Sequence, residues 1–509
     1  MVNIELSSVD LDAIKVQTSL ATDLSSTFIS LMEGVVQDSA QNLAFEIPVD
    51  NATGSRRFTP DTTRPNLITF DLDMDSVMLT LVFDEAVDVT TLDLDQIEIQ
   101  NRVSTPSVID RLRDYSFTAP NGPVVDVPLH FNDQVTLKRN VQIAVDNTTT
   151  FLVILNFAIR DMNGNYVIRI PNIAALPVRN FIPDTSQPFL TGFRFDLDAG
   201  NLYLSFDEAI QSTSVVPSRI TLLAGPSSNV THQVVTPNND RNNDATVSVT
   251  LNATDLNAIK LLDLCTDLTN CFVSIENNTV LDFVDLSNVE YPLDNPFNAT
   301  RFDRDTTAPQ LSEFVEFNLR DGIFTLEFNE PVRTDTIDPT GIVLQSLFEE
   351  PVSMYTLTNA TTDDPNGQTV VFNLSRTDLK AVQADPFICS RRYNCYVRVL
   401  SNAFQDIAGN AVQNVAEIHP GFIVTQFMLD TENPILETFS LDMNTGSITL
   451  TFSKAVSYQS LQLQQLTLQS ALDGSFSAVT AYTLTGGQVP GPDGGEIVIL
   501  LAVEDFDAL

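Results

Sequence analysis

Apolar and polar residues alternate along the chain in short runs, and these runs recur at long intervals. In one run Leu202, Leu204 and Phe206 alternate with Tyr203 and Ser205. Successive side chains of a strand point to opposite faces, so this period of two predicts a strand with one buried face. The run returns at Leu79, Leu81 and Phe83, at Phe324, Leu326 and Phe328, and at Ile448, Leu450 and Phe452. Frequent turn signals and little helical periodicity predict an all-β chain of sandwiches.

A proline-containing phrase precedes each run and divides the chain into repeats. Its opening residues are Asp61, Asp184, Asp305 and Asp430, which lie 123, 121 and 125 residues apart. A fixed interval is the signature of tandem repeats, and about 120 residues suits one β-sandwich. Proline stiffens each short linker, which favours an end-to-end rod. The predicted domains are the C-terminal half of a repeat at 1–60, complete repeats at 61–183, 184–304 and 305–429, and the N-terminal part of a repeat at 430–509.

One short helical crossover is predicted in each repeat. The phrase Asp-Leu-Asn-Ala-Ile-Lys at 255–260 follows a strand-like run and a capping residue such as Thr254, and the copy at 378–382 follows Thr377. The same phrase begins at Asp10 and again at Asp505, so the chain starts and stops at nearly the same phase of its repeat. Either the chain is a window of a longer array, which is the simpler explanation, or half-repeats at its ends complete one another across a polymer joint.

The charge balance excludes several classes of partner. Sixty-six Asp and Glu against 26 Lys and Arg give a formal charge of −40. Such a surface repels nucleic acid and anionic membranes and attracts cations. No apolar run is long enough to predict a membrane span, and the N-terminus lacks the features of a signal peptide.

Catalytic motifs are missing from the sequence. The three histidines, His130, His232 and His419, occupy unrelated positions in their repeats, so no base can be paired with a nucleophile. There is no glycine-rich phosphate loop and no basic patch. We predict that the chain is not an enzyme.

Four cysteines occur as two pairs at the same place in successive repeats. Cys265 and Cys271 lie in one repeat, and Cys389 and Cys395 lie in the next. A four-cysteine zinc site is the alternative, but it would join residues of two domains, and five-residue gaps suit zinc poorly. We favour a disulfide within each pair, which indicates a location outside the cytosol.

Recurrent carboxylates are the candidate metal ligands. They occupy the seams, the position after the strand phenylalanine, and a late turn: Asp61, Asp184, Asp305 and Asp430; Glu85, Glu208 and Glu330; Asp161, Asp285 and Asp406. Loop oxygens suit calcium, which would also offset the repulsion along so acidic a rod. The alternative is turn and cap chemistry on a solvated surface. Lys454, which stands at the Glu position of the last repeat, argues against a ligand role there.

Glycosylation is permitted at eight Asn-x-Ser/Thr sequons, although chance would supply nearly as many. They are Asn51, Asn147, Asn229, Asn252, Asn277, Asn298, Asn359 and Asn373.

The chain resembles the bacterial-type immunoglobulin-like repeats of surface-layer proteins and adhesins. The matching features are Asp-Thr-Thr-Ala-Pro at 305–309, the run at 322–332, and Asp-Ile-Ala-Gly-Asn at 406–410. The resemblance implies immunoglobulin-like sandwiches and an extracellular or cell-surface role. The predicted function is structural, as a rod- or filament-forming segment whose partners are flanking repeats or copies of itself. The alternative is an adhesin stalk that binds glycans.

Overall fold

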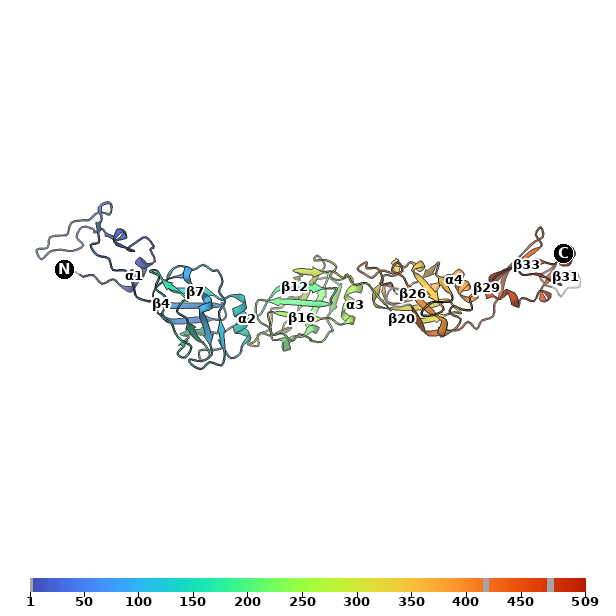
Figure 1. Cartoon of the computed structure of the whole chain (residues 1–509), viewed down its shortest axis with the longest axis horizontal. Helices are drawn as coiled ribbons and strands as arrows, with labels where there is room; N and C mark the ends of the chain where they lie inside the picture. The colour runs from blue at the N-terminus through green and yellow to red at the C-terminus, as the bar shows by residue number, and fades with distance from the viewer. Residues whose placement is uncertain (1–2, 415–420, 474–479) are drawn as a thin grey trace.

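The chain forms an elongated row of β-sheet units, with its two termini at opposite ends (Figure 1). The computed structural model describes residues 3–414, 421–473 and 480–509. Most elements are strands, and the few helices are short, so the predicted all-β array of immunoglobulin-like sandwiches is confirmed. In that described part, no helix has the length and apolar character needed to cross a membrane. The repeat limits at 61, 184, 305 and 430 stay a prediction.

Repeat 61–183 packs a larger sheet against a smaller one. The larger sheet has the order β11-β3-β4-β7, with β9 paired to β4, and the smaller has the order β10-β8-β5-β6. The strands are β3 (Leu67–Asp73), β4 (Met78–Asp88), β5 (Ile97–Gln100), β6 (Ile109–Arg111), β7 (Gly122–Pro128), β8 (Phe151–Ile154), β9 (Arg160–Asp161), β10 (Leu176–Pro177) and β11 (Asn180–Ile182). β11 lies parallel to β3, so the end of the repeat returns to its beginning and delivers the chain to the next seam.

The next two repeats keep this plan. Repeat 184–304 has the sheets β16-β13-β12-β19 and β15-β14-β17-β18. Its strands are β12 (Leu190–Asp196), β13 (Asn201–Phe206), β14 (Ile220–Leu223), β15 (Thr231–Gln233), β16 (Thr246–Thr250), β17 (Phe272–Ile275), β18 (Phe297–Asn298) and β19 (Arg301–Asp303). In repeat 305–429, β27 pairs with both sheets and joins them in the order β23-β22-β26-β27-β20-β21-β25-β24. Its strands are β20 (Leu311–Asn318), β21 (Ile323–Val332), β22 (Ile342–Gln345), β23 (Met354–Thr356), β24 (Ala360–Thr361), β25 (Gly367–Leu374), β26 (Tyr396–Val399) and β27 (Phe422–Met428).

The end segments carry only part of this plan. Residues 430–509 form β28 (Leu436–Asp442), β29 (Ser447–Val456), β30 (Thr467–Gln469), β31 (Ala481–Thr483), β32 (Gly487–Gln488) and β33 (Gly494–Leu501). Residues 3–60 form one α-helix, two short 3-10 helices and a two-stranded antiparallel sheet of β1 (Phe28–Ile29) and β2 (Thr53–Gly54). Phe439 of β28 is 56% exposed, whereas its counterpart Phe314 in repeat 305–429 is fully buried. Incomplete sandwiches therefore leave core positions open.

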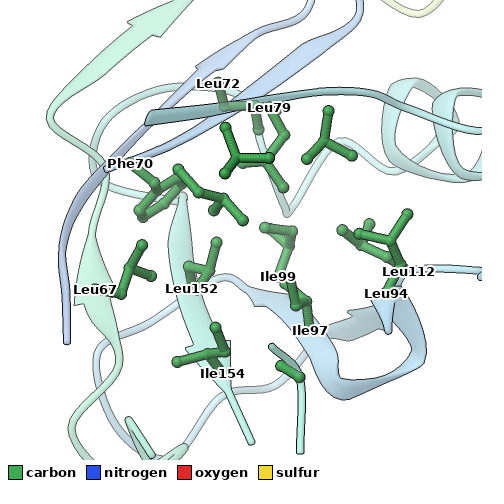
Figure 2. Close-up of a cluster of buried hydrophobic side chains, with 14 of the residues drawn as sticks. Leu67, Phe70, Leu72, Leu79, Leu94, Ile97, Ile99, Leu112, Leu152 and Ile154 are labelled. Atoms are coloured by element: carbon green, nitrogen blue, oxygen red, sulfur yellow. The ribbon is translucent and has the colours of Figure 1, made fainter. Parts of the chain in front are cut away.

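Alternating burial along the strands builds each core. Leu202, Leu204 and Phe206 are buried, and the residues between them are partly exposed, as the period of two predicts. In repeat 61–183, apolar side chains of the two facing sheets, including Phe70 and Ile99, meet between the layers (Figure 2). Each repeat thus has its own core.

The hairpin before the second strand needs a left-handed residue. Gly200, Gly322 and Gly446 have φ of 67°, 71° and 64°. Val77 occupies the same place in repeat 61–183 with φ of 57°. A β-branched residue is strained there, so this turn is the least favourable of the four.

Each unit has one short α-helix, and the first four of these helices lie beside the repeat that follows. These helices are α1 (Ser8–Lys15), α2 (Phe131–Arg139), α3 (Ala253–Leu261), α4 (Arg376–Ala384) and α6 (Val503–Ala508). The predicted caps Thr254 and Thr377 are wrong, because both lie inside the helices. Asn252 and Ser375 are the caps, and each accepts a hydrogen bond from the backbone N–H of the aspartate three residues later.

Candidate functional site: the joints between repeats

A lysine at the end of each of the first three helices enters the following repeat. Lys138 Nζ lies 2.8 Å from Asp184 Oδ2 and 2.9 Å from Glu208 Oε2. Lys15 Nζ lies 2.7 Å from Asp61 Oδ2 and 2.5 Å from Glu85 Oε2. Lys260 makes the same two contacts with Asp305 and Glu330. Each ammonium therefore bridges the seam aspartate and the strand glutamate of the next repeat.

The helix geometry explains how one short phrase serves two repeats. Asp255 and Lys260 are five residues apart, which places them about 140° apart around an α-helix. Asp255 faces its own sandwich, where it is fully buried and accepts hydrogen bonds from His232 Nε2 and from the backbone N–H and hydroxyl of Thr236. The opposite side of the helix then presents Lys260 to the neighbouring repeat. The aspartate anchors the helix, and the lysine makes the joint.

A third carboxylate completes each acidic site. The triads are Asp61, Glu85 and Asp161; Asp184, Glu208 and Asp282; and Asp305, Glu330 and Asp406, and within each triad one oxygen per residue lies within 4.8 Å of the others. The structure thus brings together nine of the recurrent carboxylates, eight of which were predicted as ligands.

The structure places Asp282, and not the predicted ligand Asp285, in the second triad. Asp285 has φ of 64° and matches Gly164 and Gly409, which have φ of 89° and 90° in the equivalent turns. It therefore fills the left-handed turn position, and its carboxylate accepts a hydrogen bond from Gln211 Nε2 instead of joining the triad.

Three carboxylates face one ammonium, so each triad carries an excess of negative charge in a buried place. Glu208 is fully buried, and Lys138 and Asp184 have side chains that are 5% and 7% exposed. Burial, opposed in part by Lys138, raises the pKa of Glu208 to about 8. Burial likewise raises the pKa of Glu85 to about 7 and raises that of Glu330. Although burial alone would lower it, the carboxylates raise the pKa of Lys138. The lysine stays charged, and the glutamate takes up a proton most readily.

The three triads differ at the late turn. Asn165 and Asn410 donate side-chain N–H groups to Asp161 and Asp406. Leu286 stands at this position after Asp282, and Asp282 Oδ2 is buried without a hydrogen-bond partner among the described residues. Glu208 Oε1 is also buried and unpartnered in that same described part of the chain. The joint at Lys138 therefore has two such oxygen atoms, as does the joint at Lys15 with Asp61 Oδ2 and Glu85 Oε1.

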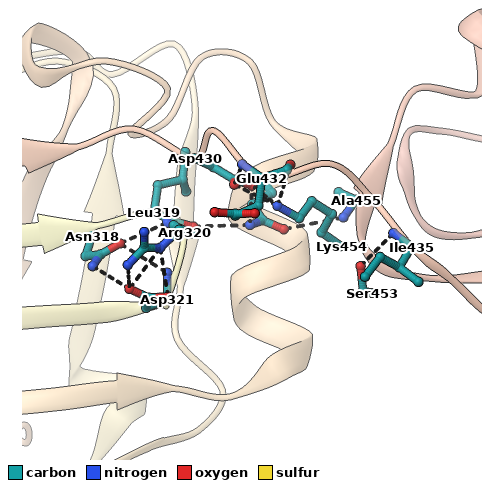
Figure 3. A network of polar contacts seen from close by, with 11 residues as sticks. Asn318, Leu319, Arg320, Asp321, Asp430, Glu432, Ile435, Ser453, Lys454 and Ala455 are labelled. Carbon is teal, nitrogen blue, oxygen red and sulfur yellow. Dashed lines mark hydrogen bonds and ion pairs between the residues drawn. The ribbon is translucent and has the colours of Figure 1, made fainter.

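The fourth joint has a different composition. Gln383 takes the place of the helix lysine, and Lys454 takes the place of the strand glutamate. Lys454 Nζ lies 2.7 and 2.9 Å from the two oxygens of Asp430 and 2.7 Å from the carbonyl oxygen of Glu432 (Figure 3). An ammonium still neutralises the seam aspartate, but it now comes from within the following repeat.

Gln383 crosses this seam through both ends of its amide. Its Nε2 donates to the carbonyl oxygen of Leu319, 3.1 Å away, and to Asp430 Oδ2, 3.2 Å away. Its Oε1 accepts from the backbone N–H of Ala455 at 3.4 Å. Lys380, one turn earlier on α4, donates to the carbonyl oxygen of Phe452 at 2.6 Å.

The small number of lysines and their positions are the sequence signal that the predictions did not use. The chain has five lysines, and all five lie at joints: Lys15, Lys138, Lys260, Lys380 and Lys454. A lysine ends in a compact point charge on a flexible stem, whereas arginine ends in a broad planar fork. Three of the five, Lys15, Lys138 and Lys260, occupy the same helix position in successive repeats, which marks a pocket that selects a primary ammonium.

The other predicted residues lie away from the joints. The structure contains the disulfides Cys265–Cys271 and Cys389–Cys395, the pairing that the sequence predicts. The asparagines of all eight sequons are exposed. His419 lies outside the described residues. His130 caps α2, and His232 contacts Asp255, so neither faces a nucleophile.

Structures similar to this chain come from surface-layer and immunoglobulin-domain proteins. One is the N-terminal part of the bacterial S-layer protein SbsC, with 10% identity and a TM-score of 0.16 over 38% of this chain and 44% of that chain. The S-layer protein rSbsC(31-844) has 10% identity and a TM-score of 0.17 over 86% of this chain and 50% of that chain. The N-terminal eight Ig domains of DSCAM have 7% identity and a TM-score of 0.17 over 89% of this chain and 53% of that chain. This chain thus spans about half of each. No protein-family model and no curated protein matches it. Likeness at these TM-scores supports no activity or partner.

Proposed function

We propose that this chain is a structural, rod-forming segment of an extracellular surface protein, such as an appendage or fibre. The observation that carries the proposal is the ion-pair joint, in which a helix lysine contacts a seam aspartate and a strand glutamate of the next repeat. This joint occurs three times. The two disulfides support a location outside the cytosol.

The buried joints stiffen the chain, because bending between repeats would separate their opposite charges. When neighbouring repeats tilt apart, Lys138 leaves Asp184 and Glu208, and the carboxylates lose their counter-charge in a poorly hydrated place. A buried charge without a partner costs several kcal/mol, roughly 3 to 5 in measured cases. The straight arrangement is therefore favoured over a bent one, even though the seam itself is short.

Electron microscopy of the intact chain tests this proposal. We expect straight particles in which neighbouring units are aligned, and a compact particle or a freely jointed string would refute it. A glycan array separates the proposal from the adhesin alternative, because only an adhesin requires a specific glycan among the bound probes.

We propose that calcium is a second occupant of the acidic joints. The donor set fits, because hard cations take carboxylate oxygens, and Glu208 Oε1 and Asp282 Oδ2 are buried without hydrogen-bond partners in the described residues. Asp184, Glu208 and Asp282 would hold the ion, which would supply the positive charge that Lys138 alone does not.

Calorimetric titration with calcium chloride checks this point. We expect binding to the intact chain that weakens in the double variant Glu208→Gln, Asp282→Asn. Substitution of Lys454 by Met at the fourth joint is the control and should leave the calcium isotherm unchanged. Absence of heat and of any shift in unfolding temperature would leave the lysines as the only cations of the joints.

We further propose that the chain has no catalytic activity and that some of its sequons carry glycans. The buried titratable clusters are engaged in contacts between repeats, which supports a mechanical role for them. Mass spectrometry of the protein secreted from a eukaryotic host would show which of the exposed asparagines are modified.

A further inference from the structure

Two positions on opposite sides of the seam change together at the fourth joint. At the first three joints the helix position is lysine and the strand position is glutamate, as in the pair Lys260 and Glu330. At the fourth joint the helix position is Gln383 and the strand position is Lys454. These two positions come from different repeats and are about 70 residues apart in sequence, yet they never change singly within this chain.

Mixed pairs would be unfavourable for a simple electrostatic reason. A lysine at position 383 would bring a second ammonium to Asp430, which Lys454 already contacts through both oxygens. A glutamate at position 454 opposite Gln383 would place a further carboxylate beside Asp430 and remove the ammonium that contacts both of its oxygens. In each mixed pair, one charged side chain is repelled by a like charge or left without a partner in a poorly hydrated joint.

We propose that the helix position and the strand position form a pairing code that determines which helix end each repeat accepts. An acidic triad accepts a helix that ends in a primary ammonium. The Asp430–Lys454 pair accepts a helix that ends in a neutral amide and rejects one that ends in lysine. This inference concerns specificity between repeats and holds whether or not the rod belongs to a surface fibre.

The contacts of Gln383 explain the second half of the code. Its side chain both donates to Leu319 O and accepts from Ala455 N, and lysine has no acceptor with which to replace the second bond. At the other joints the ammonium of Lys138 contacts two carboxylates at once, which a neutral amide cannot neutralise. Each side chain is suited to its own partner and poorly suited to the other.

Lysine reactivity provides a direct assay, because every lysine of the chain reports on a joint. The intact chain is treated with limiting acetic anhydride, and the rate at each lysine is read by mass spectrometry. In Gln383→Lys we expect Lys454 to react about tenfold faster than in the unchanged chain, because the two ammonium groups compete for Asp430. In the double variant Gln383→Lys, Lys454→Glu, the introduced lysine should be as slow as Lys260.

The third joint supplies the mirror experiment and guards against variants that fail to fold. Glu330→Lys alone should raise the reactivity of Lys260, and Lys260→Gln, Glu330→Lys should make the introduced lysine as slow as Lys454. Lys15 and Lys138 are internal references at joints that these variants leave unchanged, so a rise in their rates would report disruption beyond the altered joint. Additive effects, in which the double variants are no better protected than the single ones, would overturn the proposal. Unchanged rates in both single variants would also overturn it.

Discussion

At the scale of single residues, recurrence in the sequence predicted the acidic half of each joint and missed the basic half. The sequence predicts Asp184 and Glu208 because these acidic residues return at fixed positions. Lys138 is not predicted, because the residues around it differ from the helix phrase of the other repeats. The five-residue spacing places the lysine about 140° from the aspartate on any α-helix, but the sequence does not show which face of the helix packs against its own sandwich. The sequence predicts Asp285 and does not single out Asp282, because it does not show which aspartate of this turn takes the left-handed position.

The raised pKa of Glu208, about 8, makes the joints sensitive to alkali. In the unfolded chain this carboxyl has an ordinary pKa near 4.5, so the folded chain binds an additional proton between these values. The resulting stability is fully present below the unfolded pKa and is lost as pH rises through about 8. We expect the Lys138 joint to weaken progressively between about pH 4.5 and about pH 8. Glu208→Gln keeps the shape of the protonated carboxyl and should flatten this dependence.

Hydrogen exchange of the α2 amides (131–139) across this pH range, corrected for the intrinsic rate of exchange, measures the effect. The groups around Glu208 are Lys138, Asp184 and Asp282, and the raised pKa of Lys138 keeps it charged throughout the range. The fourth joint is the matched control, since it has Lys454 in place of the glutamate. Equal pH dependence in the variant and the unchanged chain would contradict this assignment of the proton.

At the scale of elements, the buried aspartate of the helix ties the crossover to its own sandwich. Asp378 is fully buried and accepts hydrogen bonds from Tyr355 Oη and from the backbone N–H groups of Thr358 and Asn359. The helix phrase and its strand were predicted, but this role was not, because the hydrogen-bond donors come from a hairpin about 20 residues earlier with no motif of its own. The equivalent Asp10 is exposed and contacts only Ser7 among the hydrogen bonds found.

Alanine substitution distinguishes these two aspartates. We expect Asp378→Ala to destabilise α4 by about 3 kcal/mol, because several donors lose a charged acceptor at once. Asp10→Ala, in the same phrase without the hairpin, should cost less than about 1 kcal/mol, the value of a helix-end contact. Native-state hydrogen exchange of the α1 and α4 amides measures both. Equal losses in the two helices would show that the hairpin contacts contribute little.

The disulfide loops have the same backbone conformation in repeats that lack cysteine. Cys265 and Cys389 have φ of 55° and 43°, and Ala21 and Ala144 at the same place have φ of 52° and 51°. In all four loops the N–H of this residue donates to the carbonyl oxygen five residues later. Hydrogen bonds therefore define the loop, and the disulfide is added to a shape that already exists.

Reduction of the disulfides should accordingly leave the fold intact. We expect a loss of about 2 kcal/mol in each of the two repeats that contain one, since a loop of this length restricts the unfolded chain only modestly. Differential scanning calorimetry with and without a phosphine reductant measures the loss, and circular dichroism should be unchanged. Repeat 61–183, which has no cysteine, provides the control transition. Collapse of strand content on reduction would contradict this explanation.

At the scale of the whole molecule, the sequence predicted a line of sandwiches because period, proline seams and strand alternation all act locally. It did not predict how neighbours are held, since the joint combines a helix end from one repeat with a strand and a late turn from the next. Two different effects explain the extended shape of the chain. The formal charge of −40 stretches the chain by repulsion, and the buried joints align neighbours by contact.

Salt separates these two effects. At about 1 M salt the screening length falls to about 3 Å, which removes repulsion between exposed charges but scarcely reaches a buried pair such as Lys138 with Glu208. We expect the maximum dimension from small-angle X-ray scattering to change by less than about a tenth between low and high salt. In the triple variant Lys15→Gln, Lys138→Gln, Lys260→Gln, the first three joints would rely on repulsion for their alignment, so the chain should contract as salt is added. Equal contraction of the unchanged chain would mean that charge, and not the joints, keeps the molecule straight.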